Sequence, residues 1–277
     1  MFKRCLLAVI VALLVTMTSS QIASAADVNW DSAPRIGSKA QLARYIDNER
    51  RKGQTEFHFI LTNFKVNNKA ELDRFLDELV NKIAVTTSGN GLSVDEYGIY
   101  GAKFTYTIKN EYPGTRVANA YLSSNKQQAW MNLTNEEQKL YNIAASIVDE
   151  ANRLSSEREK AEYIHKIICR HVEDFRNEND RNKTAIGALI DGYAQCQGYS
   201  DAFYMLGRMA GLNVRRISGK FGNGFHVWNT ITLSDGRTYC VDVTMDDGYN
   251  TDEWFLATFE VMKRHHSCEW ETIPNLQ

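Results

Sequence analysis

A cysteine at the predicted start of a helix is the feature that most limits what this chain can fold into. Cys196 follows a turn-forming stretch that begins at Gly192. This pattern predicts that Cys196 lies in the first helical turn, where free backbone N–H groups and the helix dipole favour a thiolate over a thiol. The helical face is formed by apolar residues at positions i, i+4, i+7 and i+11, with a glycine to end it: Tyr199, Phe203, Leu206, Ala210 and Gly211.

The composition is that of an ordinary globular protein without a nucleic-acid partner. The chain has 277 residues, with 32 Lys+Arg against 34 Asp+Glu, and 43% of its residues are hydrophobic. No basic excess of the kind that binds nucleic acid is present, and no block of like charges indicates a tail. The length allows one large domain or two small ones.

Residues 1–25 are predicted to be a secretory signal peptide. Lys3 and Arg4 form its charged start, and the apolar run over residues 5–17 is short for a membrane span. Small residues at 23–25 form a cleavage site. An uncleaved membrane anchor is the alternative. We therefore expect an extracytoplasmic protein, secreted or in the cell envelope, with no membrane contact after signal removal.

Four cysteines follow the signal peptide, and they are Cys169, Cys196, Cys240 and Cys268. They are too few for a disulfide scaffold in a chain of this size. If Cys196 is reactive, at most one bridge can form without it. A Cys240–Cys268 bridge is one candidate, and the spacing alone does not assign it.

Residues 26–125 are predicted to form a small α/β domain of unknown role. This is a normal domain size, and the default role of the segment is packing. The pattern predicts helices over 39–52 and 69–83 and strands over 55–61, 97–109 and 115–121, with a Pro-Gly turn before the last strand.

Residues 126–277 are predicted to form a second domain, which carries Cys196. Two capping boxes mark the starts of two long helices, and they are Thr134 with Glu137 and Ser156 with Glu159. After the Cys196 helix in the sequence, the alternation of apolar residues predicts three strands. Their ranges are 213–218, 225–233 and 237–244.

His226 and Asp242 are the residues that could activate Cys196. A thiolate nucleophile needs a base to hold the proton and a third group to orient that base. His226 and Asp242 lie on two strands that the sequence predicts to form a hairpin. Whether they can meet therefore depends on the register of that hairpin.

The length of the hairpin loop decides this register. A two-residue loop would pair Asn229 with Asp242 and point His226 and Asp242 to opposite faces. A three-residue loop, made by a type I turn followed by a left-handed Gly236, would place Trp228 opposite Asp242. His226 would then lie diagonal to Asp242 on the same face, roughly 7–8 Å away at the backbone. The chemistry requires the three-residue loop.

Three segments resemble motifs of the transglutaminase-like superfamily. Residues Cys196–Phe203 resemble its nucleophile helix, His226–Asn229 its histidine strand, and Tyr239–Asp247 its aspartate strand. The order Cys, His, Asp, with spacings of 30 and 16 residues, suits this family. The resemblance runs from about residue 160 to about residue 265, and it does not cover the N-terminal unit. Many members carry proline where this chain has Val243.

The resemblance implies an α+β fold, a papain-like transglutaminase core in which the nucleophile helix packs on an antiparallel sheet, preceded by the small α/β domain. It implies that Cys196 attacks an amide or ester carbonyl, that His226 moves the proton, and that Asp242 orients the imidazole. The backbone N–H of Cys196 would supply part of an oxyanion hole. Tyr193 and Gln195 are the candidates for its second donor.

Other polar clusters carry weaker signals, and neither a metal nor a cofactor is predicted. The acidic stretch over 246–253 could bind calcium, as in some animal transglutaminases, but it lacks an EF-hand pattern, so a solvated loop is expected. Two groups combine histidine with cysteine but lack a full ligand set, so local structural roles are expected for them. They are His165 with Cys169, and His265 and His266 with Cys268.

The sequence predicts the first half-reaction, formation of an acyl-enzyme, and leaves the second half open. Water as acceptor makes a cysteine peptidase or amidase, and an amine makes a cross-linking transglutaminase. Hydrolysis is favoured because no second amine-binding motif is visible. The expected partner is a protein or peptide substrate, which could belong to the cell envelope. A non-catalytic binding module of the same fold is the third alternative.

Overall fold

The computed structural model describes most of the chain outside its N-terminal segment. The described residues are 29–63, 71, 91–98, 101–108, 111–175, 179–268 and 270–277, with only the backbone for 91–98 and 101. The predicted signal peptide and, apart from residue 71, the predicted helix over 69–83 lie outside them. Among the helices within these ranges, none has the length and apolar character needed to span a bilayer.

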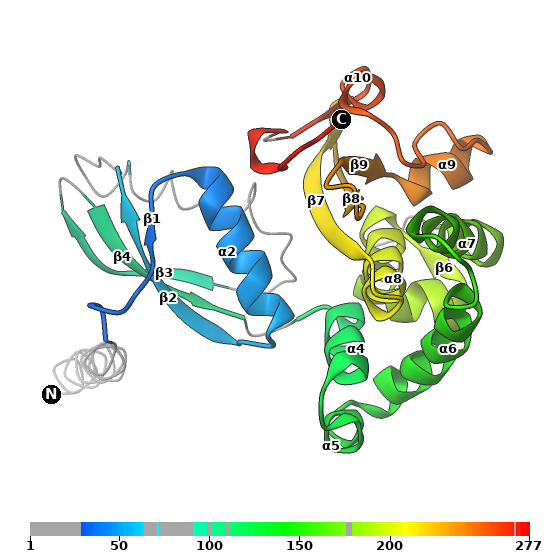
Figure 1. The fold of residues 1–277 in the computed structure, drawn as a ribbon, viewed down its shortest axis with the longest axis horizontal. Coiled ribbons are helices and arrows are strands. Elements are labelled where there is room, and N and C mark those ends of the chain that lie inside the picture. Colours follow the sequence, from blue (N-terminus) through cyan, green and yellow to red (C-terminus); the bar gives the residue numbers. More distant parts are fainter. Residues whose placement is uncertain are drawn as a thin grey trace, which may run out of the picture.

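A mixed four-stranded sheet forms the N-terminal part, with helix α2 packed against it (Figure 1). The strand order is β1-β2-β4-β3, in which β1 runs parallel to β2 and the other pairs are antiparallel. Stacked aromatic pairs, Phe57 on Tyr106 and Phe59 on Phe104, fill its core. The elements are β1 (Arg35–Ile36), α2 (Lys39–Arg51), β2 (Glu56–Thr62), β3 (Gly91–Gly98) and β4 (Gly101–Thr107).

A second, antiparallel sheet with strand order β10-β7-β8-β9 forms the C-terminal part. Helix α8 packs on this sheet, and its buried residues share one hydrophobic core with those of helices α6 and α7. Figure 1 shows α8 between the sheet and these two helices. The expected α+β fold is therefore confirmed. The strands are β7 (Asn213–Phe221), β8 (Gly224–Thr232), β9 (Thr238–Val241) and β10 (His266–Ser267), and the helix is α8 (Cys196–Met209).

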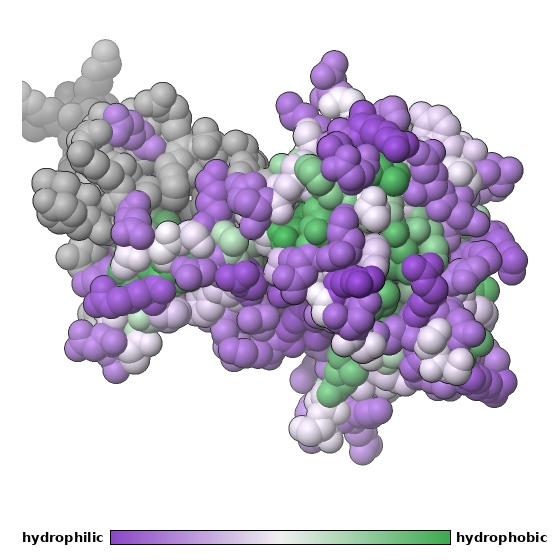
Figure 2. All heavy atoms as spheres, turned by 45° about the horizontal axis from the view of Figure 1, so that its top comes forward, coloured by the Kyte–Doolittle hydropathy of each residue, from purple (hydrophilic) through white to green (hydrophobic). Residues whose placement is uncertain are grey.

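The remaining elements surround this core. They are the helices α4 (Pro113–Leu122), α5 (Lys126–Met131), α6 (Asn135–Ala151), α7 (Glu157–His171), α9 (Val243–Tyr249) and α10 (Phe259–Met262), the short helical turns η1 (Asp180–Lys183), η2 (Gly187–Asp191) and η3 (Trp270–Thr272), and the strands β5 (Glu173–Asp174) and β6 (Tyr193–Ala194). Figure 2 shows apolar side chains gathered on one face of the C-terminal part, between hydrophilic ones.

The helix ends behave as the capping patterns predict. The Thr134 hydroxyl accepts the backbone N–H of Glu137, and the Glu137 carboxylate accepts the backbone N–H of Thr134. Ser156 and Glu159 form the same pair of bonds at the start of α7. Gly211 follows α8 with a φ of 84°, a left-handed conformation that glycine adopts without steric cost. Local sequence therefore sets the starts of α6 and α7 and the end of α8.

Three segments differ from the prediction. Residues 97–109, predicted as one strand, contribute to two, because β3 ends at Gly98 and β4 begins at Gly101. Residues 115–121, predicted as a strand, belong to helix α4, because Pro113 occupies the first helical turn instead of a hairpin turn. Val117 and Ala118 of α4 are buried in the core around α8, although they precede the boundary at residue 125 that the sequence suggested. The strand predicted over 237–244 ends at Val241, because helix α9 starts directly after it.

Asp201, on the buried face of α8, holds three segments against that helix. Its carboxylate accepts the N–H of Gly114 at 3.0 Å and the N–H of Ala185 at 2.9 Å, and it forms an ion pair with Arg216 of β7. The side chain is fully buried. The guanidinium of Arg216 lies over the Tyr204 ring, 4.2 Å from its centroid. These contacts tie α4, the segment just before η2 and the sheet to the helix that carries Cys196.

Replacing Asp201 by alanine should lower the free energy of unfolding by about 3–5 kcal/mol, because the buried Arg216 charge and two backbone N–H groups lose their acceptor. Denaturant unfolding of both proteins measures the difference. Asp149→Ala is the control: this aspartate is exposed on α6, so the change should stay within about 0.5 kcal/mol. Equal effects of the two substitutions would contradict the role of Asp201.

Candidate active site

The β8–β9 hairpin closes with the three-residue loop that the chemistry requires. Gly236 has a φ of 81°, and its N–H donates to the carbonyl of Leu233 at 2.9 Å. Asn229 pairs with Val241, and the ladder runs without a register shift to the pair Thr232–Thr238. The predicted register is therefore confirmed, and His226 and Asp242 lie on the same side of the sheet.

The His226 ring and the Asp242 carboxylate meet directly. Nε2 of His226 lies 2.6 Å from Oδ2 of Asp242, and both side chains are buried, with exposed fractions of 5% and 0%. Asp242 also caps α9, because its Oδ1 accepts the backbone N–H of Met245 at 3.2 Å. The end of β9 and the start of α9 thus fix the carboxylate from two directions.

Cys196 is the first residue of α8 and is half-buried. Its thiol forms a side-chain hydrogen bond with the His226 ring. Because Nε2 of this ring is engaged with Asp242, Nδ1 is left for the sulfur. The ring therefore has the Asp242 carboxylate at Nε2 and the Cys196 thiol among the groups that interact with it.

The electrostatics of the site favour a protonated imidazole. Burial of His226 opposes the charged ring, but Asp242 and the hydrogen bonds to Asp242 and Cys196 prevail and raise the pKa of His226 to about 10. Burial alone would raise the pKa of Asp242, but His226 and His266 hold it below its usual value. The carboxylate therefore stays ionised and the ring stays charged at neutral pH.

A glycine lets the start of α8 lie close to a neighbouring loop. A Cβ on Gly198 would sit 2.5 Å from the carbonyl oxygen of Asn182 and 2.9 Å from the Cβ of Ala194. The same carbonyl accepts the N–H of Gln195 at 2.8 Å. The helix start that carries Cys196 is therefore held against the segment before η2, and the Gln195 backbone N–H is occupied.

Two aromatic rings pack around the His226 imidazole. Trp228 stacks on it with the ring centroids 6.1 Å apart and an interplanar angle of 21°, and Phe221 meets it edge-on at 5.9 Å. Trp228 is fully buried. Its position fits both packing in the core and shielding of the His–Asp pair from water.

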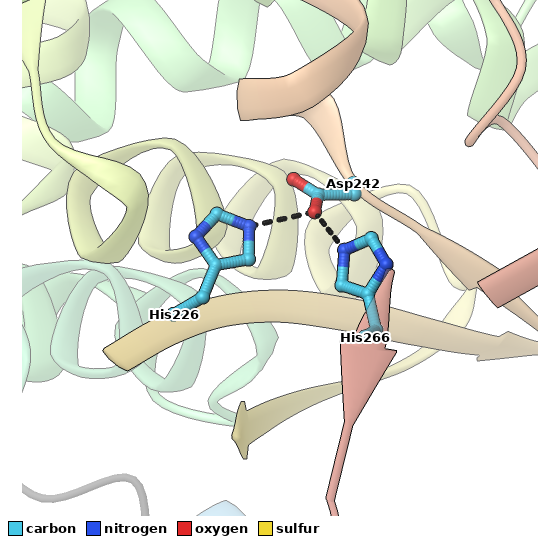
Figure 3. Close-up of side chains that lie close together, drawn as sticks. All are labelled: His226, Asp242 and His266. Atoms are coloured by element: carbon cyan, nitrogen blue, oxygen red, sulfur yellow. Dashed lines mark hydrogen bonds and ion pairs between the residues drawn. The ribbon is translucent and has the colours of Figure 1, made fainter. Parts of the chain in front are cut away.

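A second histidine, which the sequence suggested only as part of a weak cluster, belongs to this site. Nε2 of His266 lies 2.7 Å from Oδ2 of Asp242, the oxygen that also contacts His226 (Figure 3). His265 next to it is exposed, and no local pattern distinguishes the two. The short strand β10 places His266 here by pairing with β7 at the end that adjoins the active site.

His226, Asp242 and His266 are close enough to be considered as metal ligands, since their candidate ligand atoms lie within 4.8 Å of one another. The two nitrogen–oxygen distances of 2.6 and 2.7 Å are those of hydrogen bonds. Two ligands of one tetrahedral zinc ion lie about 3.3 Å apart, given metal–ligand bonds near 2.0–2.1 Å. The geometry is therefore that of imidazoles sharing a carboxylate.

The acidic stretch after β9 is not the solvated loop that we expected. Its first half belongs to α9, and Asp246 is buried, with Oδ2 2.9 Å from Nε2 of His165 and Oδ1 accepting the N–H of Trp254. Cys169 lies 3.9 Å from the same nitrogen of His165. Burial and nearby carboxylates raise the pKa of Cys169 to about 12, so this thiol stays protonated.

None of the four cysteines that follow the predicted signal peptide forms a disulfide, so the candidate Cys240–Cys268 bridge is not formed. Cys240 is buried, and burial raises its pKa to about 12. Cys196 is the cysteine among them that the structure places beside a charged imidazole.

These features define a class: an α+β domain in which a cysteine at a helix start faces a His–Asp pair on an antiparallel sheet, the papain-like transglutaminase core. Residues 142–243 match the family model of the transglutaminase-like superfamily. This part of the chain is therefore a transglutaminase-like domain, and it contains Cys196, His226 and Asp242.

Several solved structures are similar to this chain, including these two. A crystal structure of a transglutaminase (TGase) shares 14% identity at a TM-score of 0.37, covering 76% of this chain and 59% of that one. The periplasmic domain of TgpA from Pseudomonas aeruginosa shares 10% identity at a TM-score of 0.33, covering 58% and 65% respectively. The chain thus spans less than two thirds of each. The comparison with curated proteins found no match.

Proposed function

We propose that Cys196, His226 and Asp242 form a catalytic triad for thiol-dependent acyl transfer, and that the reaction is hydrolysis of peptide or amide bonds. The observation that carries this proposal is the 2.6 Å contact between Nε2 of His226 and Oδ2 of Asp242, on a ring that also interacts with the Cys196 thiol. This is the relation that a nucleophile, its base and an orienting group require.

In the first half-reaction the thiol proton resides on His226, and the sulfur attacks the carbonyl carbon of the substrate. The backbone N–H of Cys196, at the first position of α8, has no acceptor within the helix and can stabilise the oxyanion. Tyr193 and the Gln195 side chain remain the candidates for the second donor. His226 then protonates the leaving amine, the C–N bond breaks, and a thioester forms on Cys196.

In the second half-reaction an acceptor attacks the thioester while His226 takes its proton, which releases the acylated product and restores the thiol. Water as acceptor gives the carboxylic acid. An amine such as lysine would give a cross-linked amide, and this remains the alternative. We favour water because no second amine-binding motif is visible in the sequence. The expected substrate is a protein or peptide outside the cytoplasm, in line with the predicted signal peptide.

Incubation of the full chain with peptide libraries, with and without a labelled primary amine, followed by mass analysis, separates these options. Cleaved or deamidated peptides support hydrolysis, and incorporated amine supports cross-linking. The matched control is Cys196→Ala, which should give neither. If the wild-type chain leaves every peptide unchanged and its Cys196 reacts with thiol probes no faster than in the unfolded chain, the fold serves as a non-catalytic binding module.

The alkaline limit of activity should lie near pH 10. His226 must be protonated to supply the leaving amine with a proton, and its pKa is raised from 6.5 to about 10 by its partners. The imidazolium is therefore present through neutral pH and is lost as the pH rises through about 10. The pH profile of kcat/KM reports this limit. An alkaline limb near the ordinary histidine value would contradict the coupling between His226 and Asp242.

A further inference from the structure

One carboxylate oxygen of the site accepts from two histidines. Oδ2 of Asp242 lies 2.6 Å from Nε2 of His226 and 2.7 Å from Nε2 of His266. Figure 3 shows the two rings on either side of the carboxylate, with both contacts directed to the same oxygen. An ionised carboxylate can only accept hydrogen bonds, so each ring must carry a proton on the nitrogen that faces it.

The surroundings of His266 indicate which form of the ring is present. Its Nδ1 is buried and has no hydrogen-bond partner among the described residues. A charged ring would carry a proton on this nitrogen and leave a buried donor without an acceptor, which is unfavourable. His266 is therefore the neutral ring with its proton on Nε2.

The fold holds this ring in one orientation. Phe221 and Trp228 meet it edge-on, with centroid distances of 5.0 and 5.1 Å, and the ring is fully buried. Gly219 of β7 allows β10 to approach this closely, since a Cβ there would lie 2.2 Å from the carbonyl oxygen of Ser267. Of the titratable groups with a contact to the ring, Asp242 bonds it and His226 lies 5.7 Å away between centroids.

We propose that His266 is a positioning residue: its hydrogen bond fixes the Asp242 carboxylate and weakens the bond between the same oxygen and His226. Asp242 then orients His226 without binding the proton on its Nε2 too strongly. A carboxylate oxygen that accepts from two donors binds each less strongly than it would bind one alone. His226 must both take a proton from Cys196 and give one to the leaving amine, so an intermediate hold on this proton serves both steps. This role rests on the proposed acyl transfer.

Nitrogen-15 NMR of the full chain with labelled histidine tests the proposal independently of any substrate. In the wild-type protein, His266 should show the neutral form protonated on Nε2, and His226 should show a strongly hydrogen-bonded Nε2–H. In His266→Phe the signal of the His226 Nε2–H proton should move downfield. The Asp242 oxygen then accepts only this hydrogen bond, which becomes stronger. In His266→Gln, whose amide can donate in place of Nε2, the signal should stay close to its wild-type position.

Kinetics supply the second arm. His266→Phe should lower kcat/KM by about tenfold to a hundredfold, the effect expected for a lost hydrogen bond to a charged group, and His266→Gln should recover most of it. His165→Phe is the matched control, since it removes the imidazole that contacts the buried Asp246 outside the site; it should leave the His226 signal unchanged.

Three results would overturn the proposal. One is a doubly protonated His266 in the wild-type spectrum, which decides the matter even if the phenylalanine variant does not fold. The second is an unchanged His226 signal in His266→Phe. The third is a loss of rate that glutamine does not recover, which would assign His266 to packing alone. Failure of the acyl-transfer proposal is recognised separately, because the wild-type chain would then turn over no substrate while the NMR result stands.

Discussion

Replacing Cys196 by serine is expected to lower acyl transfer by at least about a thousandfold. A serine hydroxyl is a much weaker acid and a poorer nucleophile than a thiol, so its proton passes to the imidazole far less readily. The substitution changes one atom at the first position of α8, and the helix and the free energy of unfolding should be unaffected. The measurement is turnover of a peptide amide, together with the rate of labelling by a thiol-directed probe.

Cys169→Ser is the matched control for this experiment. Cys169 is also half-buried and contacts a histidine, but burial and nearby carboxylates raise its pKa to about 12, so it remains a thiol. Its replacement should leave both turnover and fast labelling intact. Fast labelling that persists in Cys196→Ser and disappears in Cys169→Ser would identify Cys169 as the reactive thiol and contradict the proposed triad.

Replacing Asp242 by asparagine should lower kcat by about three to four orders of magnitude, the size of effect seen when the orienting carboxylate of a catalytic triad is neutralised. The amide has no charge to stabilise the His226 imidazolium, and one buried Nε2–H of His226 or His266 loses a charged acceptor. The pKa of His226, raised by Asp242, should fall as well. Steady-state kinetics and a histidine NMR titration measure the two effects.

Asp246→Asn is the matched control. Asp246 is likewise a buried aspartate at the start of α9, and it contacts His165 as Asp242 contacts His226. The two substitutions should destabilise the fold to a similar extent, and only Asp242→Asn should remove activity. If both substitutions lower kcat equally, the loss would come from disturbance of α9, and the special role of Asp242 would be refuted.

Local patterns in the sequence predicted the parts of the site that depend on nearby residues. The apolar period behind Cys196 predicted helix α8, and Gly236 predicted the loop that sets the hairpin register. Register fixes which side chains share a face of a sheet, so the pairing of His226 with Asp242 followed from the turn. The resemblance to transglutaminase-like proteins agrees with the family match over residues 142–243.

The sequence by itself thus determined the helix that carries Cys196 and the strand register that aligns a base with an acid, because a period and a turn type are local properties. Only the tertiary structure decided that α4 is a helix in the core, that Asp246 is buried against His165, and that His266 joins Asp242. These outcomes depend on contacts between segments far apart in the sequence, such as His165 with Asp246, 81 residues apart, and Gly114 with Asp201, 87 residues apart. Burial and long-range pairing outweigh local preference there, since a polar group removed from water must find its partner wherever the fold provides one.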